Sequence, residues 1–148
     1  MEEKEYQKLI REALKAREFS CAPYSNYRVG AALLTGSGEI FTGCNIENAA
    51  FTPTVCAERT AFFKAVSEGR REFLAIAVTG SPAGEMTQMS WPCGVCRQVM
   101  MEFCDPETFL VIVAVSEENY RVRRLKELLP EGFGPFNLNG GQDENSFL

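Results

Sequence analysis

Three cysteines and one glutamate have types and spacings that suit metal chemistry. Cys56 precedes Glu58 by two positions, and Cys93 and Cys96 are three positions apart. Thiolates three apart at the start of a helix lie on one face and can bind one ion. The chain has no histidine, so a third zinc ligand must be a thiolate or a carboxylate, and Cys56 is the thiol beside a candidate general base. Three ligands with one open coordination position predict a catalytic zinc site, and the carboxylate predicts hydrolysis.

The spacing of Cys56 and Glu58 makes a demand on the backbone. Residues two apart in a regular helix are rotated by about 200° from each other, so both can face one site only if Cys56 stands at the helix entry. The preceding Thr52-Pro53-Thr54 favours extended or capping conformations there. Three thiolates would leave the ion with a net negative charge. Arg59, Arg97 and the two helix N-termini are expected to offset it.

Five segments, taken together, resemble the small homotetrameric zinc-dependent cytidine deaminases of pyrimidine salvage. They are Ala22–Ser25, Val29–Leu33, Gly43–Ala49, Cys56–Ala61 and Pro92–Gln98. The last segment carries the Pro-Cys-x-x-Cys signature of zinc nucleobase deaminases, of which a three-cysteine variant exists. The resemblance keeps the order and spacing of the family from the first helix to about Phe133.

For the metal site, the resemblance implies one Zn²⁺ per subunit. The matching zinc ligands are Cys56, Cys93 and Cys96. Glu58 matches the residue that shuttles protons: it would take a proton from the attacking water, which adds to C4 of the pyrimidine, and would then protonate N3 and the departing amine. The second-shell positions that support the cysteine ligands in the family are matched by Arg59 and Gln98.

For the substrate, the resemblance implies a small-molecule nucleoside. Asn45 and Glu47 match residues that hydrogen-bond the sugar hydroxyls, and the backbone around Ala57 matches the part that reads the pyrimidine edge. Phe133 matches an aromatic residue that reaches the base in a neighbouring subunit, so the implied homotetramer would have active sites completed by neighbouring subunits. Tyr27 stands where the family usually has phenylalanine, and its hydroxyl needs a partner or water near the sugar site.

Three further departures from the family lie near these motifs. Phe51 stands where tyrosine is frequent, and Pro53 and Trp91 are unusual at their positions. We expect Trp91 to pack beside a helix start, with lining of the pocket entrance as the alternative. None of these changes affects the predicted metal ligands or the proton shuttle.

Two other functions stay open beside deamination of cytidine and deoxycytidine. A related deaminase would act on another aminopyrimidine nucleoside, such as a nucleoside antibiotic, and substrate competition would reveal it. A non-catalytic zinc-binding domain would use Glu58 only as a solvated helix residue and would bind zinc without turnover. The coexistence of Asn45 and Glu47 with the metal motif favours the nucleoside deaminase.

Composition and charge indicate which binding partners and which cellular compartment to expect. A net charge of −5 disfavours binding to nucleic acid. The longest apolar run, Phe109–Val115, is too short to span a membrane. Met1–Glu5 shows no apolar segment typical of a secretory signal, so we expect a cytoplasmic protein with reduced cysteines. Beyond the ligands, we expect three partly buried packing thiols: Cys21, Cys44 and Cys104.

Hydrophobic periodicity predicts an α/β fold. Length predicts one domain, placed at residues 1–136, with a polar and mobile tail at 137–148. Helices are expected at 6–17, 56–68, 93–103 and 125–129, and strands at 29–34, 39–44, 73–78, 109–115 and 120–122. With the resemblance, this gives a three-layer αβα cytidine-deaminase-like fold with a mixed central sheet of about five strands. Both predicted zinc-bearing helices should lie on one side of that sheet.

Overall fold

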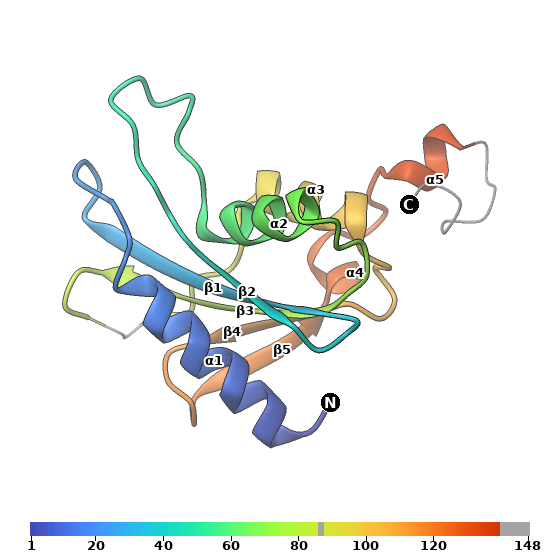
Figure 1. The fold of residues 1–148 in the computed structure, drawn as a ribbon, viewed down its shortest axis with the longest axis horizontal. Coiled ribbons are helices and arrows are strands. Elements are labelled where there is room, and N and C mark those ends of the chain that lie inside the picture. The colour runs from blue at the N-terminus through green and yellow to red at the C-terminus, as the bar shows by residue number, and fades with distance from the viewer. Residues whose placement is uncertain (86–87, 140–148) are drawn as a thin grey trace.

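The computed structural model describes residues 1–85 and 88–139, which form a mixed five-stranded sheet with helices on both faces (Figure 1). The strands are β1 (Tyr27–Thr35), β2 (Ile40–Cys44), β3 (Phe73–Pro82), β4 (Leu110–Ala114) and β5 (Tyr120–Arg124). Their order across the sheet is β2-β1-β3-β4-β5. The β3–β4 pair is parallel and the other pairs are antiparallel. The predicted mixed sheet of about five strands is therefore confirmed.

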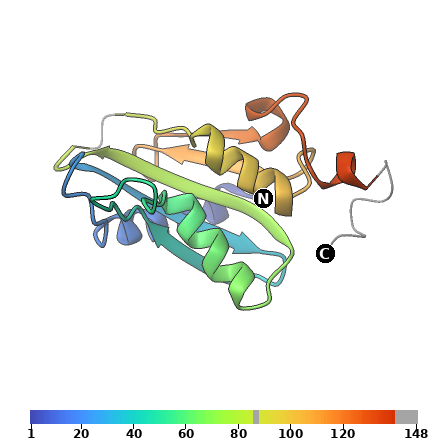
Figure 2. The ribbon, with the colours of Figure 1, turned by 90° about the horizontal axis from the view of Figure 1, so that it is seen from above.

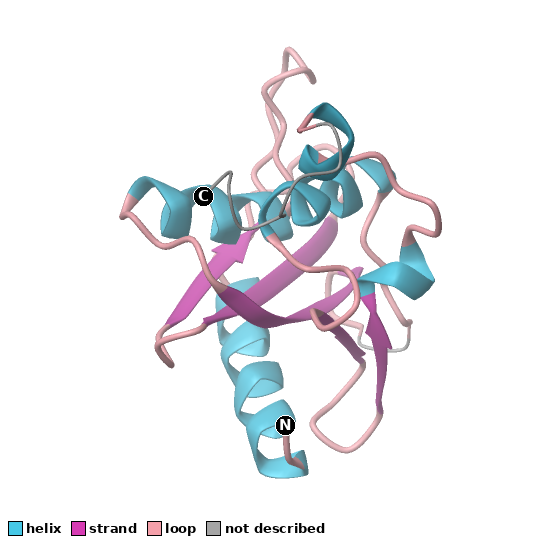
Figure 3. Ribbon diagram, turned by 90° about the vertical axis from the view of Figure 1, so that its right-hand side faces the viewer, coloured by secondary structure: helices cyan, strands magenta, loops and turns pink. Residues whose placement is uncertain are grey.

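Helix α1 (Glu3–Arg17) covers one face of the sheet (Figures 1 and 3). Its buried side chains Leu9, Ile10 and Ala13 pack against sheet residues that are mostly alanine. The sheet residues of this layer are Ala32, Ala75, Ala77, Ile112 and Ala114. Because small side chains let a helix approach the strands closely, the period-3.6 stripe of α1 is buried along its length.

Helices α2 (Ala57–Ser67) and α3 (Gly94–Phe103) lie side by side over the opposite face (Figure 2). Gly43 on β2 explains how close α2 comes. A Cβ atom there would lie 2.4 Å from the carbonyl oxygen of Ala57 and 2.6 Å from the backbone nitrogen of Ala61. Only glycine permits this contact, and it fixes the first turn of α2 against the sheet. Both predicted zinc-bearing helices thus lie on one side of the sheet, as expected.

Strands β1 and β3 extend further than the sequence pattern predicts. β1 begins at Tyr27 rather than residue 29, and β3 continues to Pro82 rather than ending at residue 78. The two added segments pair with each other, with Tyr27 opposite Pro82. The buried guanidinium of Arg17 stabilises this end of the sheet by donating to the carbonyl oxygens of Arg28 and Pro82. Long-range pairing therefore extends both strands, β3 past Gly80 and up to Pro82, although glycine and proline usually weaken a strand.

The C-terminal part of the described chain is helical. Helix α4 (Leu125–Leu128) follows β5 directly, and the short helix α5 (Pro135–Leu138) spans the expected start of the tail at residue 137. The rest of that tail, residues 140–148, lies outside the described residues. Among the described helices, none has both the length and the apolar character needed to cross a bilayer.

The three cysteines outside the predicted metal site are all free thiols. Cys44 and Cys104 are partly buried, as expected, and burial raises the pKa of each thiol. Cys21 is exposed, contrary to the prediction of a packing residue. It lies in an isolated bridge to Ile46, where its backbone rather than its side chain makes the contact.

Candidate active site

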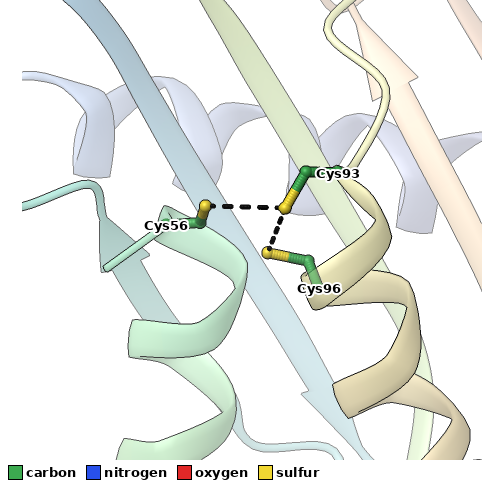
Figure 4. Close-up of side chains that lie close together, drawn as sticks. All are labelled: Cys56, Cys93 and Cys96. Carbon is green, nitrogen blue, oxygen red and sulfur yellow. Dashed lines mark hydrogen bonds between the residues drawn. The ribbon is translucent and has the colours of Figure 1, made fainter. Parts of the chain in front are cut away.

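The sulfur atoms of Cys56, Cys93 and Cys96 meet where α2 and α3 begin (Figure 4). The Cys56–Cys93 distance is 3.8 Å, the Cys93–Cys96 distance is 3.5 Å, and all three sulfurs lie within 4.8 Å of one another. A tetrahedral ion with zinc–sulfur bonds of about 2.3 Å would separate its ligands by about 3.8 Å. The three thiols therefore fit zinc. They leave the fourth position of a tetrahedron to a non-cysteine ligand.

The backbone at both helix entries is extended, not helical. Cys56 is the N-cap of α2 with φ −76° and ψ 157°, and Cys93 is the N-cap of α3 with φ −67° and ψ 167°. Cys96 lies in the first turn of α3. The prediction that Cys56 stands at a helix entry is confirmed, and it lets Cys56 and Glu58 line the same pocket despite their two-residue spacing. The positive ends of both helix dipoles point toward the thiols.

Electrostatics favours the thiolate of Cys56 over that of Cys96. A hydrogen bond from the Cys96 thiol, aided by the Arg59 guanidinium 3.2 Å from the Cys56 sulfur, lowers the pKa of Cys56 to about 5. The same bond, together with burial, raises the pKa of Cys96. Cys56 is therefore a thiolate at neutral pH and can bind a metal directly, whereas Cys96 needs a cation to stabilise its thiolate.

Glu58 lies beside these sulfurs and is only 4% exposed. Burial raises its pKa to about 7, and the negative charge of Cys56 acts in the same direction against the hydrogen bond from its own backbone. A carboxyl group with a pKa near 7 can both accept and release a proton at neutral pH, as a general acid-base catalyst requires. Glu58 is thus buried at the site, unlike the solvated helix residue of the non-catalytic alternative.

A pocket of about 350 Å³ adjoins the sulfurs, within the range typical of small-molecule sites. Two groups of predicted residues line it. We call the first group the metal cluster: Cys56, Glu58 and Cys93, together with Cys96 behind them. We call the second group the strand-entry cluster, because it surrounds the start of β1: Tyr27, Asn45 and Glu47. Ala57 also lines the pocket, so the structure brings together most of the residues singled out in the sequence.

Asn45 ties β2 to the start of β1. Its Oδ1 accepts hydrogen bonds from the backbone N–H of Val29, at 2.9 Å, and from the Ser20 hydroxyl. Its Nδ2 donates to the carbonyl oxygen of Tyr27 at 2.8 Å. Asn45 is 9% exposed and lines the pocket. Its amide is held in place by the backbone groups of Val29 and Tyr27.

Glu47 holds the segment before β1. Its carboxylate accepts hydrogen bonds from the backbone N–H groups of Tyr24 and Ser25, at 2.9 and 3.0 Å, and from the Ser25 hydroxyl. The Ser25 hydroxyl, followed by these backbone donors, keeps the pKa of Glu47 below its ordinary value. Glu47 is therefore an ionised acceptor on the pocket wall, and a carboxylate has more acceptor sites than these three donors occupy.

Two residues predicted to act near the cysteines bind elsewhere. Gln98 donates from Nε2 to the carbonyl oxygen of Phe133 at 2.8 Å. Arg97, expected to offset the charge of the thiolates, donates to the carbonyl oxygens of Pro92 and Leu128, each at 2.7 Å. Arg97 thus joins the start of α3 to the last residue of α4, and Gln98 joins α3 to the loop that holds Phe133. Of the charged partners foreseen for the thiolates, Arg59 is the one that contacts a sulfur.

The structure also places two residues that sequence reasoning left open or missed. Trp91 both lines the pocket and packs against the core beneath α3, so the two alternatives for it hold together. Ser90 lines the pocket and was not foreseen, since a serine in a loop gives no periodic or motif signal. Phe133 is 57% exposed on this chain and lies outside the lining of the pocket described here.

Comparison with known proteins gives a consistent result. Residues 3–112 match the model of the cytidine and deoxycytidylate deaminase zinc-binding region. A cytidine deaminase of Sporosarcina psychrophila is 55% identical over 90% of this chain and 94% of its own length, and one of Halalkalibacterium halodurans is 45% identical over 90% and 97%. The crystal structure of cytidine deaminase from Burkholderia pseudomallei, 48% identical, superposes with a TM-score of 0.77 and covers 85% of this chain and 97% of that one.

Proposed function

This chain belongs to the family of zinc-dependent cytidine deaminases, and from that premise we propose that it hydrolyses cytidine and deoxycytidine to uridine and deoxyuridine with release of ammonia. The observation that carries the proposal is a nearly buried glutamate beside three converging thiols on the wall of a pocket of nucleoside size. Net hydrolysis consumes one water, breaks the bond between C4 and its amino nitrogen, and forms a carbonyl at C4.

The metal cluster would hold one Zn²⁺ per chain through Cys56, Cys93 and Cys96. When bound, zinc supplies a Lewis acid that lowers the pKa of water at the open position. Arg59 offsets part of the negative charge of the thiolates through its contact with Cys56. This contact preserves the electrophilic character of the site that three thiolates would otherwise reduce.

Glu58 would move the protons. With a pKa near neutrality, its carboxylate accepts a proton from the attacking water and passes it to N3 of the pyrimidine. It then takes the proton of the new C4 hydroxyl, which becomes the carbonyl, and delivers it to the leaving amine. The burial that raises its pKa also excludes bulk water from the transfer. Ala57 lies between Cys56 and Glu58 and is buried, and we propose that its backbone faces the pyrimidine edge.

The strand-entry cluster would bind the sugar. The ionised carboxylate of Glu47 can accept hydrogen bonds from sugar hydroxyls, and the amide of Asn45 stands beside it on the pocket wall. Such groups distinguish a nucleoside from the free base, because a base without a sugar offers no hydroxyl to the acceptor sites of Glu47 that the protein leaves open.

The test is ammonia release from cytidine by the zinc-loaded protein, with Glu58→Gln beside it. We expect turnover by the wild type and a loss of roughly 10²–10⁴-fold in kcat for the variant with zinc content unchanged, the range typical of general acid-base catalysis. Undiminished turnover by the variant would refute the role of Glu58. Zinc without turnover on cytidine would direct attention to other aminopyrimidine nucleosides, and failure on those would favour a binding domain.

We further propose a cytoplasmic homotetramer acting in pyrimidine salvage on free nucleosides rather than on nucleic acid or at a membrane. Large apolar side chains exposed on the described chain support an assembly, among them Phe63, Val95 and Phe133. Gln98 anchors the backbone of Phe133, which would present its ring to a neighbouring subunit. Light scattering coupled to size exclusion would test this, since a fully active monomer would contradict the shared pocket.

A further inference from the structure

The hydroxyl of Tyr27 joins the start of β1 to the segment that precedes Cys93. Tyr27 Oη lies within hydrogen-bond distance of Ser90 Oγ and 3.3 Å from Gln88 Oε1. Ser90 Oγ in turn donates to the carbonyl oxygen of Gly80 at 2.7 Å. Since the single hydroxyl proton of Ser90 is used on Gly80, the proton between Tyr27 and Ser90 belongs to Tyr27. Tyr27 therefore donates to Ser90 and, through the same proton, to Gln88 Oε1, while Ser90 donates to Gly80.

Tyr27 is the fixed member of this chain of hydrogen bonds. Its carbonyl oxygen accepts from Asn45, its backbone N–H donates to Ser25 Oγ at 3.0 Å, and its residue pairs with Pro82 across the sheet. Ser90 lies in an irregular loop segment. Its Cβ and Oγ approach Gly80 so closely that a side chain at that glycine would lie 3.0 Å from Oγ. Ser90 thus attaches the loop to β3 through Gly80, and the phenol of Tyr27 attaches the same serine to β1.

The residue held in place by this tie is Trp91, next to Ser90. Its ring lines the pocket, packs against the core, and has the guanidinium carbon of Arg123 5.8 Å from its centroid. A cation at this distance orients an aromatic ring. Trp91 is also two residues before Cys93, so a shift of the segment would be felt by both the pocket wall and the metal cluster.

We propose that Tyr27 is a positioning residue: through Ser90 its hydroxyl fixes Trp91 as a wall of the substrate pocket, and Trp91 contacts the bound pyrimidine nucleoside. This inference rests on the proposed function. It assigns a common purpose to two of the four departures from the family pattern, Tyr27 and Trp91. The wall contributes to substrate binding and not to proton transfer, because none of its polar groups reaches Glu58 in the described contacts.

Trp91 is the only tryptophan of the chain, so intrinsic fluorescence reports directly on this wall. In the zinc-loaded wild type, uridine, the unreactive product, should change the Trp91 emission in a saturable manner. Tyr27→Phe removes only the hydroxyl. We expect it to red-shift the emission of the free protein, weaken uridine binding and raise the KM for cytidine by roughly three- to tenfold, the equivalent of one lost neutral hydrogen bond, with kcat within twofold of wild type.

Ser90→Ala supplies an independent variant that breaks the same tie from its other side. We expect the same direction of change, and the double variant should be no worse than Ser90→Ala alone, because Ser90→Ala already removes the bond to Tyr27 together with the bond to Gly80. Tyr120→Phe is the matched control: Tyr120 packs against Tyr6 in the layer of α1 on the opposite face. It should keep the wild-type KM and emission.

The outcomes separate this inference from the proposed function. A wild type without turnover on cytidine would refute the proposed function. A wild type that turns over cytidine, with Tyr27→Phe and Ser90→Ala both matching it in KM and emission, would overturn the inference alone. A fall in kcat at unchanged KM would also overturn it, because the phenol would then act in the chemical step. An emission unaffected by uridine would show that Trp91 does not contact the nucleoside.

Discussion

The metal cluster and the strand-entry cluster line one pocket but are built in different ways. The thiols of the metal cluster lie at two helix entries. Cys56 is the N-cap of α2, Cys93 is the N-cap of α3, and Cys96 lies in the first turn of α3. The strand-entry cluster draws Tyr27, Asn45 and Glu47 from two segments about twenty positions apart and fixes them by hydrogen bonds to backbone groups. Two helices position the side chains of the metal cluster. The side chains of the strand-entry cluster, by contrast, make hydrogen bonds that themselves stabilise the segments that carry them.

This difference predicts how each cluster responds to change. A residue of the metal cluster can be altered with a loss of chemistry and little loss of fold, because the helices remain. A residue of the strand-entry cluster serves both the sheet and the proposed sugar site, so its replacement should change stability and substrate binding together. Four experiments test this contrast.

Loss of a buried thiolate should have the largest effect. Cys96→Ser replaces the fully buried ligand by a hydroxyl, which is a poor ligand for zinc at neutral pH. We expect zinc to be largely lost and ammonia release from cytidine to fall to the uncatalysed level, measured by elemental analysis and a deaminase assay. The exposed thiol of Cys21 offers a matched control, and a Cys21→Ser protein that also lost its zinc would contradict the assignment of ligands.

Removal of the buried charge of Glu58 should stabilise the zinc-free protein. Its folded pKa is raised from 4.5 to about 7, so the folded state binds more protons than the unfolded state between these values. Its contribution to stability therefore falls as pH rises through that window. At pH 8 we expect zinc-free Glu58→Gln to exceed the wild type by about 3 kcal/mol in free energy of unfolding, with the gap closing below pH 4.5.

Urea denaturation at pH 8, 6 and 4.5 measures this difference. Glu102→Gln, an exchange of the same kind at an exposed position of α3, should show no pH-dependent gap. Equal free energies of unfolding for the wild type and Glu58→Gln at every pH would contradict this prediction, because burial of Glu58 would then not raise its pKa.

Replacement of Asn45 should affect fold and binding at once. Asn45→Ala leaves the N–H of Val29 and the carbonyl of Tyr27 without these partners, which should lower the free energy of unfolding by about 2 kcal/mol. It should also raise the KM for cytidine. Thermal or urea unfolding beside steady-state kinetics tests both. A variant with wild-type stability and a raised KM would reduce the role of Asn45 to sugar binding alone.

Replacement of Glu47 should give the smallest effect. Glu47→Gln removes the charge that attracts hydroxyl donors, and we expect a KM for cytidine raised about tenfold with kcat within twofold. Glu118→Gln, in the exposed turn between β4 and β5, should change neither constant. If kcat fell as much as kcat/KM, Glu47 would act in the transition state rather than in binding the sugar.

The sequence alone determined the residues of the metal cluster. Ligand chemistry depends on residue type, and local helix geometry accounts for the shared face of Cys93 and Cys96 and for the position of Cys56 at a helix entry. The absence of histidine, the Pro-Thr segment before Cys56 and the two-residue spacing of Glu58 were enough to predict an extended N-cap, which the structure has. The same local periodicity located most of the helices and strands within a few residues of their ends.

Only the tertiary structure decided the contacts between segments far apart in the chain. The extra length of β1 and β3 comes from their pairing, the partner of Gln98 is a carbonyl thirty-five residues away, and Trp91 reaches the pocket because Tyr27 and Ser90 meet across sixty-three residues. A hydrogen bond can form between any suitable donor and acceptor that the fold brings together, so residue type alone does not predict the partner of a side chain. The tertiary structure decides the partner, because it determines which donors and acceptors lie close together.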